Sequence, residues 1–190
     1  MHEGLPPSAW LQRFAGLLRP HGTVLDLACG SGRHVRWLTE RGHAVTAVDR
    51  DAQALAPLAA IAETLVADLE DGPWPLTARQ FDAVLVTNYL WRPLWPALLA
   101  ALAPGGVLIY ETFALGQQTV GRPARSEFLL RPGELLQVCA GLRVVAFEDG
   151  FEPGDALHPP RFVQRIAAVS EAPEAAADAL APPRHGLTTG

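Results

Sequence analysis

The stretch that most constrains the fold covers residues 24–32 and reads VLDLACGSG. Residues 24–27 are apolar except for one acid, Asp26, a pattern typical of a strand that is buried on both faces. The two glycines that follow predict a tight turn, and residues 33–41 predict a helix. A strand, a glycine turn and a helix in this order form a corner that binds nucleotides. The glycines let the backbone approach a ligand, and the start of the helix offers unpaired N–H groups.

The spacing of the glycines separates two families that use such a corner. The dinucleotide fingerprint G-x-G-x-x-G needs a third glycine, and Val35 stands at that position. The sequence instead resembles the class I S-adenosylmethionine (SAM)-dependent methyltransferases, whose first motif is roughly D-x-G-x-G-x-G. Here the first glycine of that motif is replaced by Ala28. A tight turn without a ligand is the structural alternative. The resemblance implies that the cofactor lies against Asp26, Ala28, Cys29, Gly30 and Gly32.

Two further acids stand at the ends of predicted strands. Residues 44–49 predict a strand that ends at Asp49, about 20 residues after the glycine turn, where a carboxylate accepts hydrogen bonds from ribose hydroxyls. The alternative for Asp49 is a helix cap. Residues 64–67 predict a third strand, and the resemblance implies that Asp68 accepts from the adenine amino group while Leu69 supports the ring. The alternative for Asp68 is an acid that faces water.

The fourth predicted strand, residues 81–87, ends at Asn88. In a doubly wound sheet its carboxyl end lies beside that of the first strand, and ligands bind in the crevice between them. Asn88 is therefore a candidate cofactor contact, and Tyr89 and Trp91 are candidates for catalysis and for substrate contact. The alternatives are a turn residue for Asn88 and packed aromatic rings for the other two.

Several weaker candidates surround this crevice. His34 and Arg50 are candidate cofactor contacts, with helix packing or solvent exposure as the alternatives. Residues 114–130 predict a loop at the carboxyl end of the sheet, which is a candidate lid. Its arginines suit a carboxylate or an oxyanion, or are simply solvated. Two arginines of this loop, Arg122 and Arg125, are candidate substrate contacts. The other weak candidates for a catalytic base are Tyr110, Glu111 and His158.

The remaining patterns agree with the same resemblance. The opening F-D-x-V of the fourth strand and L-x-P-G-G-x-L at residues 102–108 are further markers of the family. The resemblance implies a Rossmann-like α/β fold with a doubly wound seven-stranded sheet in the order 3-2-1-4-5-7-6, strand 7 antiparallel, and helices on both faces. Apolar spacing predicts further helices over residues 9–18, 52–62, 93–102 and 131–140, and further strands over residues 107–113, 142–148 and 162–169. We expect one domain over residues 1–170 and a mobile tail over 171–190, with a candidate short helix at 172–181.

Composition restricts the partners. The 190 residues carry a net charge of −5, which argues against sequence-independent binding of nucleic acid. The two cysteines and six histidines show no spacing typical of a metal site. We see neither a secretory signal nor an apolar stretch long enough for a membrane, so we expect a cytoplasmic setting and no membrane partner.

The sequence therefore predicts a SAM-dependent methyltransferase that acts on a small molecule, with the tellurite-resistance type as the nearest subfamily. A SAM-binding module without turnover is the main alternative. The missing third glycine argues against an NAD-dependent oxidoreductase. Residues 88–91 read NYLW and lack the Asn-Pro-Pro-Tyr type of motif, which argues against methylation of nucleic-acid bases.

Overall fold

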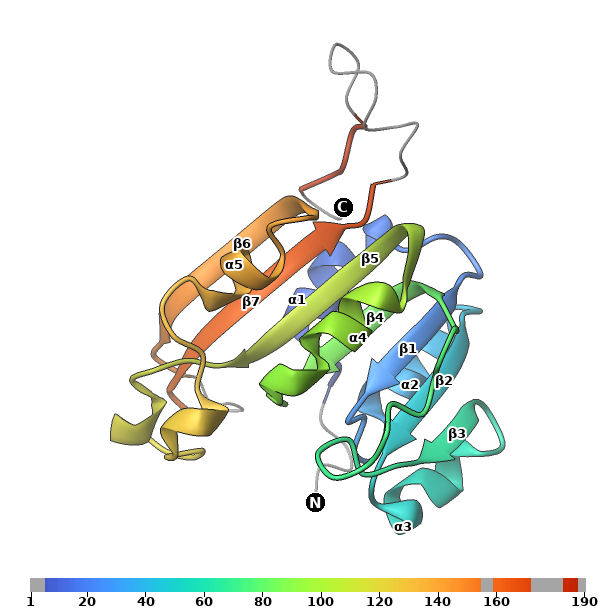
Figure 1. Ribbon diagram of the computed structural model, residues 1–190, viewed down its shortest axis with the longest axis horizontal. Helices are drawn as coiled ribbons and strands as arrows, with labels where there is room; N and C mark the ends of the chain where they lie inside the picture. The colour runs from blue at the N-terminus through green and yellow to red at the C-terminus, as the bar shows by residue number, and fades with distance from the viewer. Residues whose placement is uncertain (1–5, 155–158, 172–182, 188–190) are drawn as a thin grey trace.

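A seven-stranded sheet runs through the molecule in the order β3-β2-β1-β4-β5-β7-β6 (Figure 1). The computed structural model describes residues 6–154, 159–171 and 183–187. β7 is antiparallel to β5 and β6, and the other neighbouring strands are parallel. The predicted strand order and direction are confirmed. The strands are β1 (Thr23–Leu27), β2 (Ala44–Asp49), β3 (Glu63–Val66), β4 (Phe81–Thr87), β5 (Leu102–Phe113), β6 (Arg143–Glu152) and β7 (Arg161–Val169).

The helices are short and cover both faces of the sheet. In Figure 1, α4 and α5 lie on the near face, whereas α1 and α2 lie on the far face. The α-helices are α1 (Ala9–Phe14), α2 (Arg33–Thr39), α3 (Ala52–Leu55), α4 (Trp95–Ala100) and α5 (Glu134–Val138). Single turns of 3-10 helix are η1 (Ala15–Leu17), η2 (Ala56–Leu58), η3 (Arg92–Leu94), η4 (Gln117–Thr119) and η5 (Ser126–Phe128).

Two hydrophobic clusters hold these layers together, one on each face. The first packs α4 and α5 against the sheet and includes Leu98, Tyr110 and Leu135. The second packs α1, α2 and α3 against the other face and includes Trp10 and Leu38. Because β1 and β4 are covered on both sides, their side chains are almost wholly buried, which explains why these strands read as apolar runs.

The predicted helices were too long in several places. The helix predicted for residues 9–18 ends at Phe14 and continues as η1, and the helix predicted for 52–62 consists of α3 and η2. Pro57 lies in η2, where the missing N–H and the fixed φ angle favour a break in the α-helix. Residues 172–181, the candidate tail helix, lie outside the described residues.

The strands at the other end of the sheet are longer than predicted. β5 begins at Leu102, which pairs with Phe81, and pairing resumes at Val107 after an irregularity that contains Gly105 at a φ of 80°. β6 extends to Glu152, so the hairpin with β7 reaches beyond the carboxyl end of β5. The loop after β5 packs against this hairpin, since the Ala114 N–H donates to the Phe162 carbonyl at 2.9 Å.

Candidate cofactor and active site

The glycine turn after β1 brings the backbone close to the carboxyl ends of the neighbouring strands. Ala28, Gly30 and Gly32 have φ angles of 53°, 54° and 77°, so all three residues are in the left-handed region. A Cβ on Gly30 would have no heavy atom within 4 Å, whereas a Cβ on Gly32 would lie 2.4 Å from the Leu58 side chain. Gly30 therefore leaves space beside the turn, and Gly32 is needed for packing against η2.

Asp49 joins the turn to the end of β2. Its Oδ2 accepts a hydrogen bond from the Gly30 N–H at 2.8 Å, and its Oδ1 accepts one from the Asp51 N–H at 2.9 Å. Each carboxylate oxygen has a further lone pair, so the group keeps acceptor capacity for a ligand. The helix cap considered as the alternative role falls to Asp51, whose carboxylate accepts from the Gln53 and Ala54 N–H groups.

A cavity of about 200 Å³ lies beside this carboxylate. Five of its seven lining residues are candidates from the sequence: Ala28, Asp49, Arg50, Leu69 and Tyr89. The sequence analysis missed the other two, Ala67 and Glu70. Both lie within two residues of Asp68, so the end of β3 is the feature of the sequence that could have predicted them.

Asp26 is buried in β1, directly below the turn. Burial raises its pKa to about 8, with the charges of Arg33 and Asp49 as smaller opposing influences. Neither of its oxygens has a hydrogen-bond partner within the described part of the chain, and His34 Nδ1 is 3.8 Å away from Oδ2. Burial also lowers the pKa of His34 to about 3. Burial therefore disfavours the charged form of both side chains.

The end of β4 forms a second strained turn at the crevice. Asn88 has a φ of 54° and donates its N–H to the Glu111 carbonyl at 2.9 Å. Tyr110 is buried, and its hydroxyl donates to the Tyr89 carbonyl at 2.8 Å. Burial raises the pKa of both tyrosines above its usual range, so neither hydroxyl is a base at neutral pH.

Glu111 lies on the opposite face of β5, in a cluster of charges beneath α1. Its Oε1 accepts from the Ser8 hydroxyl at 3.1 Å, and its Oε2 is 3.4 Å from Arg165 Nε and 3.8 Å from Arg161 Nη2. Arg165 also pairs with Glu148 and Glu152 on β6. The Glu111 carboxylate therefore links the residue before α1 to the β6–β7 hairpin.

Comparison with known proteins shows the fold and a domain match over part of the chain. Residues 24–106 match the family described as methyltransferase domain. This match covers a little less than half of the chain. The structure resembles TehB from Haemophilus influenzae with a TM-score of 0.67, at 19% identity over 83% of this chain and 60% of that one. It resembles a SAM-dependent methyltransferase from Methanosarcina mazei with a TM-score of 0.67, at 17% identity over 88% of this chain and 100% of that one.

A curated relative is similar in sequence over a shorter stretch. The malonyl-[acyl-carrier protein] O-methyltransferase of Serratia marcescens is 35% identical in an alignment of 111 residues that covers 53% of this chain. The chain spans only 42% of the length of that enzyme. The match therefore supports the methyltransferase domain and leaves the acceptor to be argued from the site.

The cofactor of this class is SAM, as the sequence predicts, and the residues of the methyltransferase domain fit it. The turn has an open side at Gly30, and the Asp49 carboxylate lines the adjoining cavity. The buried oxygens of Asp26 lack partners within the described residues, as expected for a group that awaits a ligand or water. Polar groups around a partly apolar hollow at the switch point of the sheet are typical of a nucleoside site.

Several other candidates from the sequence are not among the residues that line this cavity. Cys29 packs in the core, and Asp68 accepts the Glu70 N–H at 2.9 Å. Trp91 packs against the cluster around α4. Arg122 is exposed, and Arg125 contacts Glu127 and Phe128 within its own loop. His158 lies outside the described residues.

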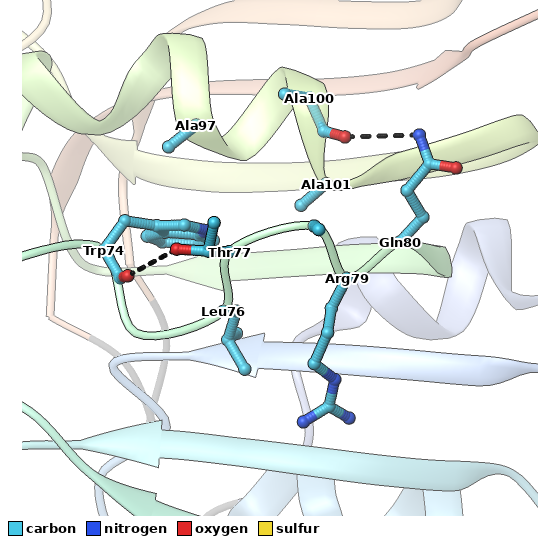
Figure 2. A pocket seen from close by; sticks show the side chains of 9 residues that line it. Trp74, Leu76, Thr77, Arg79, Gln80, Ala97, Ala100 and Ala101 are labelled. Atoms are coloured by element: carbon cyan, nitrogen blue, oxygen red, sulfur yellow. Dashed lines mark hydrogen bonds between the residues drawn. The ribbon is translucent and has the colours of Figure 1, made fainter.

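A second cavity, of about 260 Å³, has a different character. It lies between the segment before β4 and helix α4, and Trp74, Ala97 and Ala101 line it (Figure 2). Figure 2 shows two of its polar side chains hydrogen-bonded within the protein: the Gln80 amide donates to the Ala100 carbonyl, and the Thr77 hydroxyl donates to the Trp74 carbonyl. A third, Arg79, pairs with Glu63. None of the candidate site residues lines this cavity.

The described part of the chain holds neither a cluster of metal-binding side chains nor a helix suited to a membrane. Among residues 6–154, 159–171 and 183–187, no three His, Cys, Asp or Glu side chains gather as a metal would require. In the same residues, no helix has the length and the apolar character needed to cross a membrane.

Proposed function

We propose that the protein transfers the methyl group of SAM to a small-molecule acceptor. The observation that carries this proposal is the Asp49 carboxylate, which is fixed to the Gly30 N–H at 2.8 Å and lines the cavity at the carboxyl ends of the strands. A carboxylate in this position accepts hydrogen bonds from two ribose hydroxyls at once. The matched domain and the fold support the same conclusion.

In this proposal the residues of the crevice have separate roles. Asp49 holds the ribose, and Leu69 and Tyr89 enclose the base, with Asp68 as the proposed acceptor for its amino group. Gly30 leaves room for the amino-acid part of the cofactor above Asp26. When bound, SAM supplies a methyl group that is already activated, so the protein mainly orients the acceptor and excludes water.

The chemistry of the crevice favours an acceptor that arrives as a nucleophile. Of the candidate bases, Tyr89 and Tyr110 have raised pKa values and keep their protons at neutral pH. Glu111 is engaged by Ser8 and lies next to Arg165. Thiolates and carboxylates need no proton removed before the attack, whereas ammonium groups do. We therefore propose an anionic acceptor.

A product assay tests both parts of this proposal. The full chain is incubated with SAM labelled in its methyl group and with a panel of free thiols, carboxylates and amines. We expect labelled products from the thiols or carboxylates and none from the amines. Methylation of an amine alone would contradict the proposed acceptor class. Binding of S-adenosylhomocysteine (SAH) without any product would favour the SAM-binding module instead.

A further inference from the structure

The turn that follows β4 is held from β5 at two points. Asn88 adopts the left-handed conformation, with a φ of 54°, and its N–H donates to the Glu111 carbonyl at 2.9 Å. The next carbonyl, that of Tyr89, accepts the Tyr110 hydroxyl at 2.8 Å. Asparagine is one of the few residues other than glycine that adopt this conformation with some frequency, and contacts with the surrounding chain hold it in one geometry. The two hydrogen bonds are such contacts.

The side chain that leaves this turn enters the candidate nucleoside cavity. Tyr89 lines it together with Asp49, Arg50 and Glu70. Its hydroxyl is buried and has no hydrogen-bond partner within the described residues. Burial raises the pKa of this hydroxyl, and the nearby charges of Glu70 and Asp68 raise it further. Because the Tyr89 carbonyl is held by the Tyr110 hydroxyl, the backbone from which the Tyr89 ring extends is fixed from β5.

We propose that Tyr110 is a positioning residue for the cofactor, acting through Tyr89. Tyr110 is 2% exposed, so no water replaces its hydroxyl if the hydroxyl is removed. A phenylalanine would fill nearly the same volume and leave the Tyr89 carbonyl without its donor. The turn would then sample other conformations, and the ring would spend less time against the nucleoside. This inference rests on the proposed function, because it concerns the same cavity.

The test is a double-mutant cycle in which the affinity for SAH is measured by calorimetry. A net hydrogen bond corresponds to about a threefold to tenfold change in Kd, so Tyr110→Phe is expected to weaken SAH binding by about that factor. In a Tyr89→Ala background the ring is absent, and Tyr110→Phe is expected to change Kd by less than twofold. Equal effects in the two backgrounds would overturn the inference, because a merely structural role does not depend on the Tyr89 ring.

The matched control is Thr112→Val, which removes a hydroxyl from the next buried residue on the same face of β5. We expect its Kd to equal that of the wild type. If Tyr110→Phe does not fold, Asn88→Gly loosens the same turn without changing the core. It is expected to weaken SAH binding in the Tyr89 protein and not in the Tyr89→Ala protein, and equal effects there would again overturn the inference.

The outcomes separate this inference from the proposed function. A wild-type protein that does not bind SAH contradicts the proposed function itself. A wild-type protein that binds SAH, with Tyr110→Phe and Asn88→Gly as tight as the wild type, contradicts only the role of Tyr110.

Discussion

Replacing Asp49 by asparagine is the sharpest perturbation that the site offers. The carboxylate accepts the Gly30 N–H at Oδ2 and the Asp51 N–H at Oδ1, at 2.8 and 2.9 Å. In Asp49→Asn one of these acceptors becomes an NH₂ group. Whichever way the amide is turned, a donor then faces a backbone N–H, and the negative charge is lost. The substitution therefore disturbs the turn as well as the ribose contacts, although its shape is unchanged.

The size of the effect follows from the bonds that are lost. A hydrogen bond to a charged group contributes about 1.5–3 kcal/mol, and in the proposed complex at least one ribose hydroxyl loses such a bond to the carboxylate. We therefore expect the Kd for SAH to rise by about 10- to 150-fold in Asp49→Asn, as measured by calorimetry. Asp49→Ala is also expected to weaken binding, because it removes the acceptors altogether.

Asp51 provides the matched control, since it is an acid two residues away with a different role. Its Oδ1 caps α3 by accepting the N–H groups of Gln53 and Ala54. Asp51→Ala is expected to lower the free energy of unfolding by about 1 kcal/mol and to leave the Kd for SAH within twofold of the wild type. The reasoning is refuted if Asp49→Asn binds SAH as tightly as the wild type, or if Asp51→Ala weakens binding equally.

Three further predictions concern stability and are measured by urea unfolding. Ala28 has a φ of 53°, so Ala28→Gly relieves backbone strain. It is expected to leave the free energy of unfolding unchanged or to raise it by up to about 1 kcal/mol, and a decrease of that size would show that Ala28 is not strained. Glu111→Gln removes one of the three counter-charges of the buried Arg165 and is expected to cost about 1–2 kcal/mol. Arg125→Ala breaks an exposed pair and is expected to cost less than about 0.5 kcal/mol. Equal costs would disprove the difference in burial. The pKa of Asp26 is raised to about 8 from an ordinary value of 3.8, so the folded state keeps a proton that the unfolded state loses. The wild type should therefore lose stability between pH 4 and 8, by at most about 1.4 kcal/mol per pH unit from this group, and Asp26→Asn should lose less over the same range. Parallel curves for the two proteins would show that Asp26 is ionised when folded.

The order of the strands and the place of Asp49 could both be predicted from the sequence. Strands buried on two faces read as apolar runs, and the glycine turn, the acid after β2 and the Pro-Gly-Gly segment occur in a fixed order. Parallel strands bring their carboxyl ends to one edge of the sheet. Gly30 and Asp49 are therefore close in space although they are far apart in the sequence, and the Gly30 N–H donates to Asp49 Oδ2 at 2.8 Å.

The lengths of the helices could not be predicted in the same way. The apolar pattern of residues 93–102 continues across structures of different kinds: η3 ends at Leu94, α4 ends at Ala100, and Leu102 already pairs with Phe81 in β5. Apolar spacing reports which residues face the core, and that face is shared by a helix and the strand that follows it. Tertiary pairing decides where one ends and the other begins.

Tyr110 and Glu111 are adjacent in β5 but contact different layers of the protein. Successive side chains of a strand point to opposite faces, so two adjacent residues of β5 cannot both turn toward the same layer of the protein. Tyr110 faces α4 and reaches the Tyr89 carbonyl, whereas Glu111 faces α1 and pairs across the sheet with Arg165. The alternation alone predicts that the two residues separate. Which of them serves the crevice depends on the register of β7, because that register places a guanidinium beside Glu111 and engages the carboxylate in a structural role.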